Sequence, residues 1–212
     1  MPAPERPKDI VSMDELSIKY FDVFHLKNLY ISMHEWLAEE GWYGKAGPRT
    51  GEPKYKRHSD IETLYFVNDY QKGLHRGGKE MWIWWRLWKN VAGKRSEYFK
   101  YRIELDLHVE YMTTKEVMHQ GKKMKANYGE IQLWIRPVIE STMHNKWEKH
   151  WFLKHWVDWF EKRIWSQEIE KMEKDLWRES YRFQGMIKRY LDLRTFIPTP
   201  ESFHPKQFGW GH

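Results

Sequence analysis

Residues 98–112, YFKYRIELDLHVEYM, carry the most regular pattern in the chain. Aromatic and aliphatic side chains alternate there with a polar series formed by Lys100, Arg102, Glu104, Asp106, His108 and Glu110. Successive side chains of a β-strand point to opposite faces of a sheet, so this period of two predicts a strand with one buried face and one wet or ion-paired face. A strand of this length is unusual, and we expect a bulge or a strong twist within it.

Neighbouring segments extend this strand into a sheet. Two β-rich segments, 61–70 and 81–89, are separated by glycines, which favours a hairpin. A small hairpin at 116–125 and another alternating strand at 129–139 follow. Pro137 lacks a backbone N–H, so its nitrogen should lie at an edge or a bulge. The pattern predicts an antiparallel meander of about five strands.

Helical periodicity flanks the sheet on both sides. Between residues 22 and 41 apolar side chains recur at spacings of three and four, which predicts one amphipathic helix. Residues 145–194 carry two such stripes with neither Gly nor Pro between Trp165 and Glu168, so the pattern leaves a bent helix and a two-helix hairpin both open. We expect the hairpin, because one helix would be about 70 Å long and would bury little of its stripe.

The remaining segments show no period. We expect residues 1–12 to form a mobile, Pro-rich arm, residues 41–60 a long loop and residues 197–212 an irregular tail. The sequence therefore predicts a single α+β domain over residues 1–212. Its elements are an N-terminal helix, an antiparallel sheet over residues 61–140 and a C-terminal helical hairpin.

The composition restricts the classes of function. The chain has no Cys, which excludes disulfides, thiolate metal sites and a Cys nucleophile. No apolar run approaches the about 18 residues of a membrane span, and no secretion signal is recognised, so we expect a cytoplasmic protein without a transmembrane segment. Glycine-rich nucleotide motifs and the Gly-x-Ser-x-Gly elbow do not occur, so we predict no cofactor, and an enzyme is the minority hypothesis.

A basic, Trp-rich segment is the first candidate site. The formal net charge is +6, and Trp82, Trp84, Arg86 and Trp88 share one face of a strand in the most basic part of the chain. Aromatic rings interleaved with cations suit single-stranded nucleic acid or lipid headgroups. A strand covered on both faces by helices or by a second subunit explains the same pattern. The predicted partner-binding residues are Lys72, Arg76, Lys79, Trp82, Trp84, Arg86, Trp88, Lys94, Arg95, Lys100 and Arg102.

The acidic row of the long strand is the second candidate. Glu104, Asp106 and His108 combine residue types that hold metals or transfer protons. One strand spaces such groups about 6.6 Å apart, so a compact site needs residues from neighbouring strands. Cross-strand ion pairs explain the row equally well. We therefore assign no metal ligand or catalytic residue and keep these three side chains as a candidate polar site.

An aromatic stripe with histidines is the third candidate. Trp147, Trp151 and Trp156 recur at helical spacing, and the histidines beside them are His144, His150 and His155. An aromatic, basic amphipathic helix can lie on an anionic membrane. Packing of the stripe against the sheet is the role that we expect. No His-Glu-x-x-His spacing indicates a zinc protease.

Four short segments carry a resemblance to a known family: MWIWWR at 81–86, QGKK at 120–123, WEKHWFLKH at 147–155 and FHPK at 203–206. They resemble a conserved, functionally uncharacterised family of small-genome archaea. The resemblance implies an archaeal intracellular protein without an assigned activity, and it transfers no site residues.

Three functions remain open from the sequence. The first is a non-enzymatic binding or scaffold protein that docks on nucleic acid or an anionic membrane through the basic, Trp-rich segment. The second is a self-assembling structural protein, a homo-oligomer. The third is a small-molecule binder or enzyme with Glu104, Asp106 and His108 in a pocket between sheet and helices. The patterns do not decide the sheet order or which face of the 81–89 strand is buried.

Overall fold

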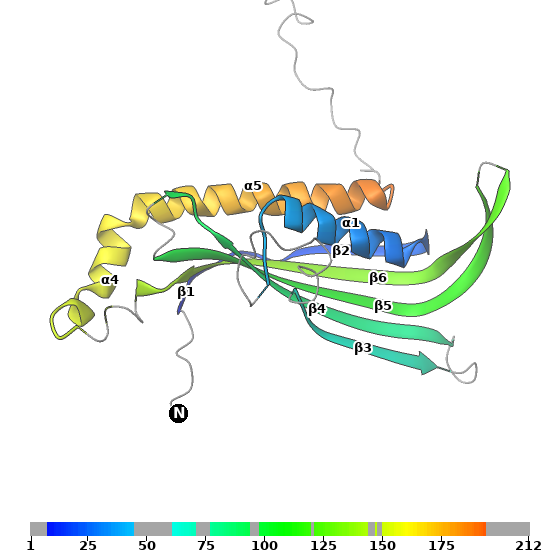
Figure 1. Cartoon of the computed structure of the whole chain (residues 1–212), viewed down its shortest axis with the longest axis horizontal. Helices are drawn as coiled ribbons and strands as arrows, with labels where there is room; N and C mark the ends of the chain where they lie inside the picture. The colour runs from blue at the N-terminus through cyan, green and yellow to red at the C-terminus, as the bar shows by residue number, and fades with distance from the viewer. Residues whose placement is uncertain are drawn as a thin grey trace, which may run out of the picture.

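The computed structural model describes residues 8–44, 61–70, 77–93, 98–119, 121–143, 147 and 150–193. A curved antiparallel sheet of six strands carries helices on one side (Figure 1). The strands are β1 (Lys8–Ser12), β2 (Leu16–Phe24), β3 (Glu62–Tyr70), β4 (Gly78–Asn90), β5 (Phe99–His119) and β6 (Lys122–Ser141). The two long helices are α1 (Leu26–Glu39) and α5 (Ser166–Tyr190). The predicted mixture of helices with an antiparallel sheet is confirmed.

The sheet order, which the sequence left open, is β1-β6-β5-β4-β3, and β2 also pairs with β6. β1 and β2 lie one after the other along the same side of β6, and the chain leaves the ladder between Ser12 and Leu16. The carbonyl of Pro137 accepts a hydrogen bond from the Met13 nitrogen in that gap. N–H and C=O of one strand residue point to the same side, so the proline nitrogen also faces this break, as the sequence predicted.

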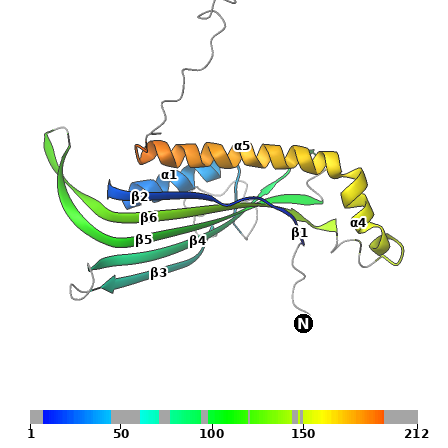
Figure 2. The same cartoon turned by 180° about the vertical axis from the view of Figure 1, so that it is seen from behind.

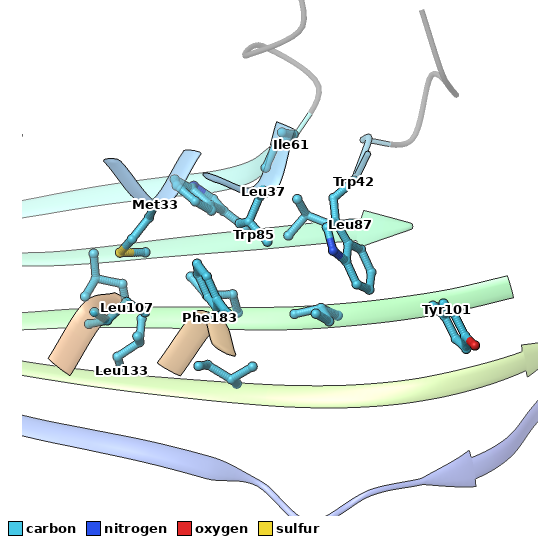
Figure 3. Close-up of a cluster of buried hydrophobic side chains, with 14 of the residues drawn as sticks. Met33, Leu37, Trp42, Ile61, Trp85, Leu87, Tyr101, Leu107, Leu133 and Phe183 are labelled. Atoms are coloured by element: carbon cyan, nitrogen blue, oxygen red, sulfur yellow. The ribbon is translucent and has the colours of Figure 1, made fainter. Parts of the chain in front are cut away.

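The core lies between the sheet and the helices. Met81, Ile83, Trp85 and Leu87 of β4 are buried on the face that α1 and α5 cover. Figure 2 shows from behind that both helices lie on the same side of the sheet. Figure 3 shows side chains of this core, with Phe183 of α5 lying over the buried rows of the central strands. This answers which face of β4 is buried.

The long strand contains the bulge that its length predicts. The register of β5 against β6 shifts between Glu110 and Thr113, and Tyr111 adopts a positive φ of 53°. Two neighbouring strands approach closely there. A Cβ on Gly129 would lie 2.7 Å from the Glu110 carbonyl oxygen, and one on Gly78 would lie 2.8 Å from the Tyr111 carbonyl carbon. Glycine is therefore required beside the bulge.

The C-terminal hairpin is not formed, and this prediction was wrong. After Leu153–His155 and Val157–Trp159 (α4), a single π-type turn at Phe160–Ile164 leads into α5 without a loop. Figure 1 shows the chain turning a corner between α4 and α5. A π-turn can kink a helix without Gly or Pro. The 25 residues of α5 span about 37 Å, so α5 alone covers much of the sheet.

The N-terminal expectations need two corrections. Residues 8–12, expected in a mobile arm, form β1 because the edge of β6 offers them backbone partners. The helix expected over residues 22–41 begins only at Leu26, where His25 caps it by accepting a hydrogen bond from the Asn28 backbone nitrogen. The preceding segment, LSIKYFDVF, alternates and pairs with β6 as β2. Of the loop predicted at 41–60, the structure describes residues 41–44, where Tyr43 forms an isolated antiparallel bridge with Trp88. Residues 45–60 and the predicted tail at 197–212 lie outside the described residues.

Gly129→Ala tests the close approach at the bulge. The added methyl group meets a backbone oxygen that cannot rotate away, so we expect the free energy of unfolding to fall by about 2 kcal/mol. Gly185→Ala is the control, because its Cβ meets nothing within 4 Å and Ala favours a helix interior by about 1 kcal/mol. Urea unfolding of both variants measures the difference. Equal effects would contradict the close approach.

Candidate functional site

The face of the sheet turned away from the helices, here called the open face, brings two predicted groups together. Cross-strand neighbours in β4 and β5 pair Trp82 with His108, Trp84 with Asp106 and Arg86 with Glu104. The basic, Trp-rich set and the acidic row were separate candidates in the sequence. The register places them side by side on one surface.

Stacked rings lie at one end of this face. The Trp82 ring stacks on the His108 imidazole, with centroids 3.6 Å apart. Trp84 and Trp134 lie parallel to the Trp82 ring at centroid distances of 5.5 Å and 6.3 Å. Sequence reasoning missed Trp134 of β6. Its alternation with Ile131 and the other buried residues of the strand was the available signal.

An ion-pair network occupies the centre of the open face. Arg86 Nη1 lies 2.7 Å from Asp106 Oδ1, and Arg136 of β6 contacts the other oxygen of the same carboxylate. Arg102 Nη2 lies 3.3 Å from Glu104 Oε1. Arg136 was not among the predicted residues. The acidic row is therefore paired with arginines from both neighbouring strands, which is the explanation that the sequence left open beside a metal or proton-transfer site.

Glu140 of β6 is the most deeply buried carboxylate of this network. Its side chain is only 2% exposed, Arg102 contacts it, and Trp88 Nε1 donates a hydrogen bond to it at 3.1 Å. Burial raises the pKa of this carboxyl, and the charge of Arg102 opposes that rise. The polar groups of Arg102 and Trp88 are thus occupied by contacts with a buried carboxylate.

The open face is acidic rather than basic among the residues that the structure describes. Its basic side chains are Lys19, Arg86, Lys100, Arg102 and Arg136. Its acidic side chains are Asp9, Glu80, Glu104, Asp106, Glu110, Glu130 and Glu140. Carboxylates outnumber the cations, so the centre of the sheet gives no electrostatic support for an anionic partner.

The other predicted cations do not change this result. Lys79 lies 3.9 Å from Asp69 near the start of β4. Lys89, a further cation of β4, extends to the helical side of the sheet. Its Nζ lies 2.6 Å from Oε1 of Glu179 in α5. The predicted residues that lie outside the described part of the chain are Lys72, Arg76, Lys94, Arg95 and His144.

One group on the open face could hold a metal ion. Glu80 of β4 lies beside His108 and Glu110 of β5, and one ligand atom from each falls within 4.8 Å of the others. The sequence pointed to His108 but not to Glu80, because the register that joins β4 to β5 is not visible in a single segment.

A basic β-ribbon extends from the sheet. Beyond the pairing of Lys79 with Met112 and of Phe24 with Asn127, the strands β5 and β6 pair only with each other in the described structure. We call residues 115–126 the β5–β6 ribbon. Figure 1 shows it extending past the end of β2 and curving toward the helical side. Its exposed cations are Lys115, Lys123 and Lys125, none of which forms an ion pair with a described residue.

The aromatic stripe does not behave as expected. Trp147 and Phe160 pack partly buried against the core, but Trp151 is 79% exposed and Trp156 and Trp159 are also exposed. This segment lies at the corner between α4 and α5, beyond the end of the sheet (Figure 1). The predicted core packing was therefore wrong for Trp151 and Trp156, and Trp159, which continues the same stripe, is exposed as well.

A cavity of about 380 Å³ lies between α1 and the β3–β4 hairpin. Tyr30 donates a 2.7 Å hydrogen bond to Glu62 at its wall, and burial raises the pKa of Tyr30. Glu104, Asp106 and His108 lie on the opposite face of the sheet. They therefore cannot supply the polar groups of a pocket between the sheet and the helices.

Comparison with known proteins gives no match to a protein-family profile, a curated protein or a solved structure. The described part of the chain contains no helix long and apolar enough to cross a membrane. Any functional conclusion thus rests on the geometry described above.

Arg102→Met tests the network. It leaves the Glu140 carboxylate buried without its cation, which we expect to cost about 3 kcal/mol of stability near neutral pH. Without Arg102 the pKa of Glu140 rises further, so the folded state holds its proton more tightly than the unfolded chain. Stability then falls as the pH rises above the ordinary carboxyl pKa of 4.5, and the deficit should be smaller near pH 4 than near pH 7.

Arg178→Met is the control for this test. Arg178 pairs with Asp175 at 3.2 Å on the exposed side of α5, where such a pair contributes less than about 1 kcal/mol. Chemical unfolding of both variants across this pH range measures the effect. A pH-independent deficit for Arg102→Met would contradict the role assigned to Glu140.

Proposed function

We propose that this protein binds double-stranded DNA through the β5–β6 ribbon. The observation that carries the proposal is a two-stranded projection with exposed lysines on both of its faces. On one face, the Lys115 ammonium lies over the Tyr128 ring, 3.2 Å from its centroid, and the side chain is still exposed to solvent. The sequence predicts an anionic partner, and DNA is such a partner. The proposed contact surface is the β5–β6 ribbon, however, and not the open face. The arginines of the open face are occupied by carboxylates, whereas Lys115, Lys123 and Lys125 are exposed.

The two-sided charge favours a groove over a flat surface. Lys115 lies opposite Ala126, whereas Lys123 lies opposite Met118 and Lys125 opposite Glu116. Because side chains alternate along a strand, Lys115 points to one face of the ribbon and the other two lysines to the opposite face. A planar membrane would contact one face at a time. The walls of a DNA groove carry phosphates on both sides of an inserted ribbon.

The dimensions of the groove select the kind of duplex. The major groove of B-form DNA is about 12 Å wide and admits a two-stranded ribbon, whereas that of A-form RNA is deep and narrow. Met118 and Met124 are exposed on the ribbon, one on each face. Such apolar side chains can contact thymine methyl groups once phosphate contacts have positioned the ribbon.

Lys123→Ala combined with Lys125→Ala tests the proposal. Each lost phosphate contact lowers the dependence of log K on log salt by about 0.9, so we expect the slope to fall by about 1.8 with a labelled mixed-sequence duplex. Fluorescence anisotropy over a salt series gives the slope. The control variant, Lys171→Ala with Lys174→Ala on α5, makes the same charge change and should leave the salt slope unaltered.

Lys115→Ala separates groove entry from one-sided contact. Insertion into a groove requires that this variant also weakens duplex binding, because Lys115 lies on the other face of the ribbon. Undiminished binding in this variant would exclude groove entry. Binding to vesicles of anionic lipid without any binding to the duplex would refute the DNA proposal altogether.

Self-association through β3 is a second candidate, favoured by a specific observation. β3 is an edge strand, and four consecutive apolar side chains along it, residues 64–67, are exposed. Exposed apolar edge strands pair with other chains unless they are protected. We infer from this edge a route to the homo-oligomer expected from the sequence.

Leu64→Lys with Phe66→Lys tests this candidate. The wild-type protein should show a mass that grows with concentration in light scattering, and the variant should stay monomeric at the same concentrations. Ile31→Lys places a charge at an exposed apolar position of α1 and is the control. A monomeric wild-type protein throughout the accessible range would eliminate this candidate.

A further inference from the structure

Three side chains with metal-binding atoms converge on the open face, away from the β5–β6 ribbon. His108 Nε2 lies 2.9 Å from Glu80 Oε1 and 3.5 Å from Glu110 Oε1. His108 is 5% exposed, so the imidazole is held inside the protein while the two carboxylates reach it from the solvent side. The group combines one nitrogen and two oxygen donors.

Register shifts explain how a flat sheet forms so compact a group. Side chains at i and i+2 on one strand stand about 6.6 Å apart. The ladder of β4 with β5 shifts between Lys79 and Met81, and that of β5 with β6 shifts directly after Glu110. Bulges re-aim the side chains beside them and are frequent next to functional sites. Here they bring Glu80 of β4 to the His108–Glu110 pair.

We propose that Glu80, His108 and Glu110 bind a first-row divalent transition-metal ion, with Zn²⁺ as its representative. Ligand atoms around a tetrahedral zinc with bonds of 2.0–2.2 Å lie about 3.3 Å from one another. The two distances from His108 Nε2 bracket that value. An imidazole with two carboxylates suits zinc and its neighbours, whereas Ca²⁺ and Mg²⁺ prefer oxygen donors alone.

The surroundings of the group fit a metal site. Trp82 stacks on His108 and also donates a 3.0 Å hydrogen bond from Nε1 to Glu80 Oε1, so one ring positions two of the three ligands. Hydrogen-bonded carboxylates of this kind are typical around bound metals. A divalent cation would also neutralise two carboxylates that stand close together. Three protein ligands leave at least one coordination position for water or a substrate atom.

The test measures binding of Zn²⁺ alone to the purified, metal-stripped full chain by isothermal titration calorimetry. We expect one equivalent to bind to the wild-type protein. Losing a group that only orients a ligand costs about 10- to 100-fold in affinity, so Glu110→Gln, which removes a ligand, should weaken binding more than tenfold. Glu116→Gln, an exposed carboxylate of the ribbon, should bind as the wild type does. Glu80→Gln removes a second ligand and should also weaken binding more than tenfold, so the test needs no substitution of the buried His108.

Co²⁺ provides a second readout, because its visible absorption depends on the atoms that coordinate it. Side chains that only stabilise the fold would not produce this absorption. The visible absorption bands of Co²⁺ should show a four- or five-coordinate ion with a nitrogen ligand. Binding should quench Trp emission, and Trp82→Phe should reduce that quenching, because the Trp82 ring lies 3.6 Å from the His108 ring. Absence of stoichiometric Zn²⁺ binding, or equal affinity in Glu110→Gln and Glu116→Gln, would overturn the proposal.

Discussion

Burial of one face of β4, β5 and β6 beneath α1 and α5 is the constraint on which the rest of the structure depends. Trp85, Leu105 and Leu133 are removed from water there, and each such side chain contributes about 1.5–3 kcal/mol. Because the side-chain period of a strand is two, fixing the apolar row fixes the polar row on the other side. A slip of one residue would bury the acidic row, so the register is strongly specified.

On the open face, the charged side chains of β5 form ion pairs with those of the neighbouring strands. Arg86, Arg102 and Arg136 are shared among carboxylates of neighbouring strands, and the deepest of these carboxylates belongs to Glu140. These pairs hold the face in one arrangement and leave little positive charge for a partner. In the proposed function, contact with DNA falls to the β5–β6 ribbon, whose lysines form no ion pairs with described residues. Stability and the proposed binding would then belong to different parts of the same two strands.

Local patterns predicted local features. The alternation at 98–112 predicted both faces of β5, and the length of the strand predicted its bulge. The missing N–H of Pro137 predicted a break in the ladder beside it. Non-local features were not predictable: β1 and β2 exist because β6 offers an edge, and Glu80 reaches His108 only through the register of β4 against β5. The aromatic stripe misled for a related reason. Helical spacing shows which side chains share a face but not whether a sheet lies beneath them, and Trp151 has none.

Hydrogen exchange with and without duplex DNA tests the central claim most directly, because it locates the contact surface without any substitution. The account predicts that amides of residues 115–126 exchange more slowly in the complex, while those of β4 around Trp82 and Trp84 keep their rates. Protection centred on β4, or no protection of the ribbon at DNA concentrations that saturate binding, would contradict it.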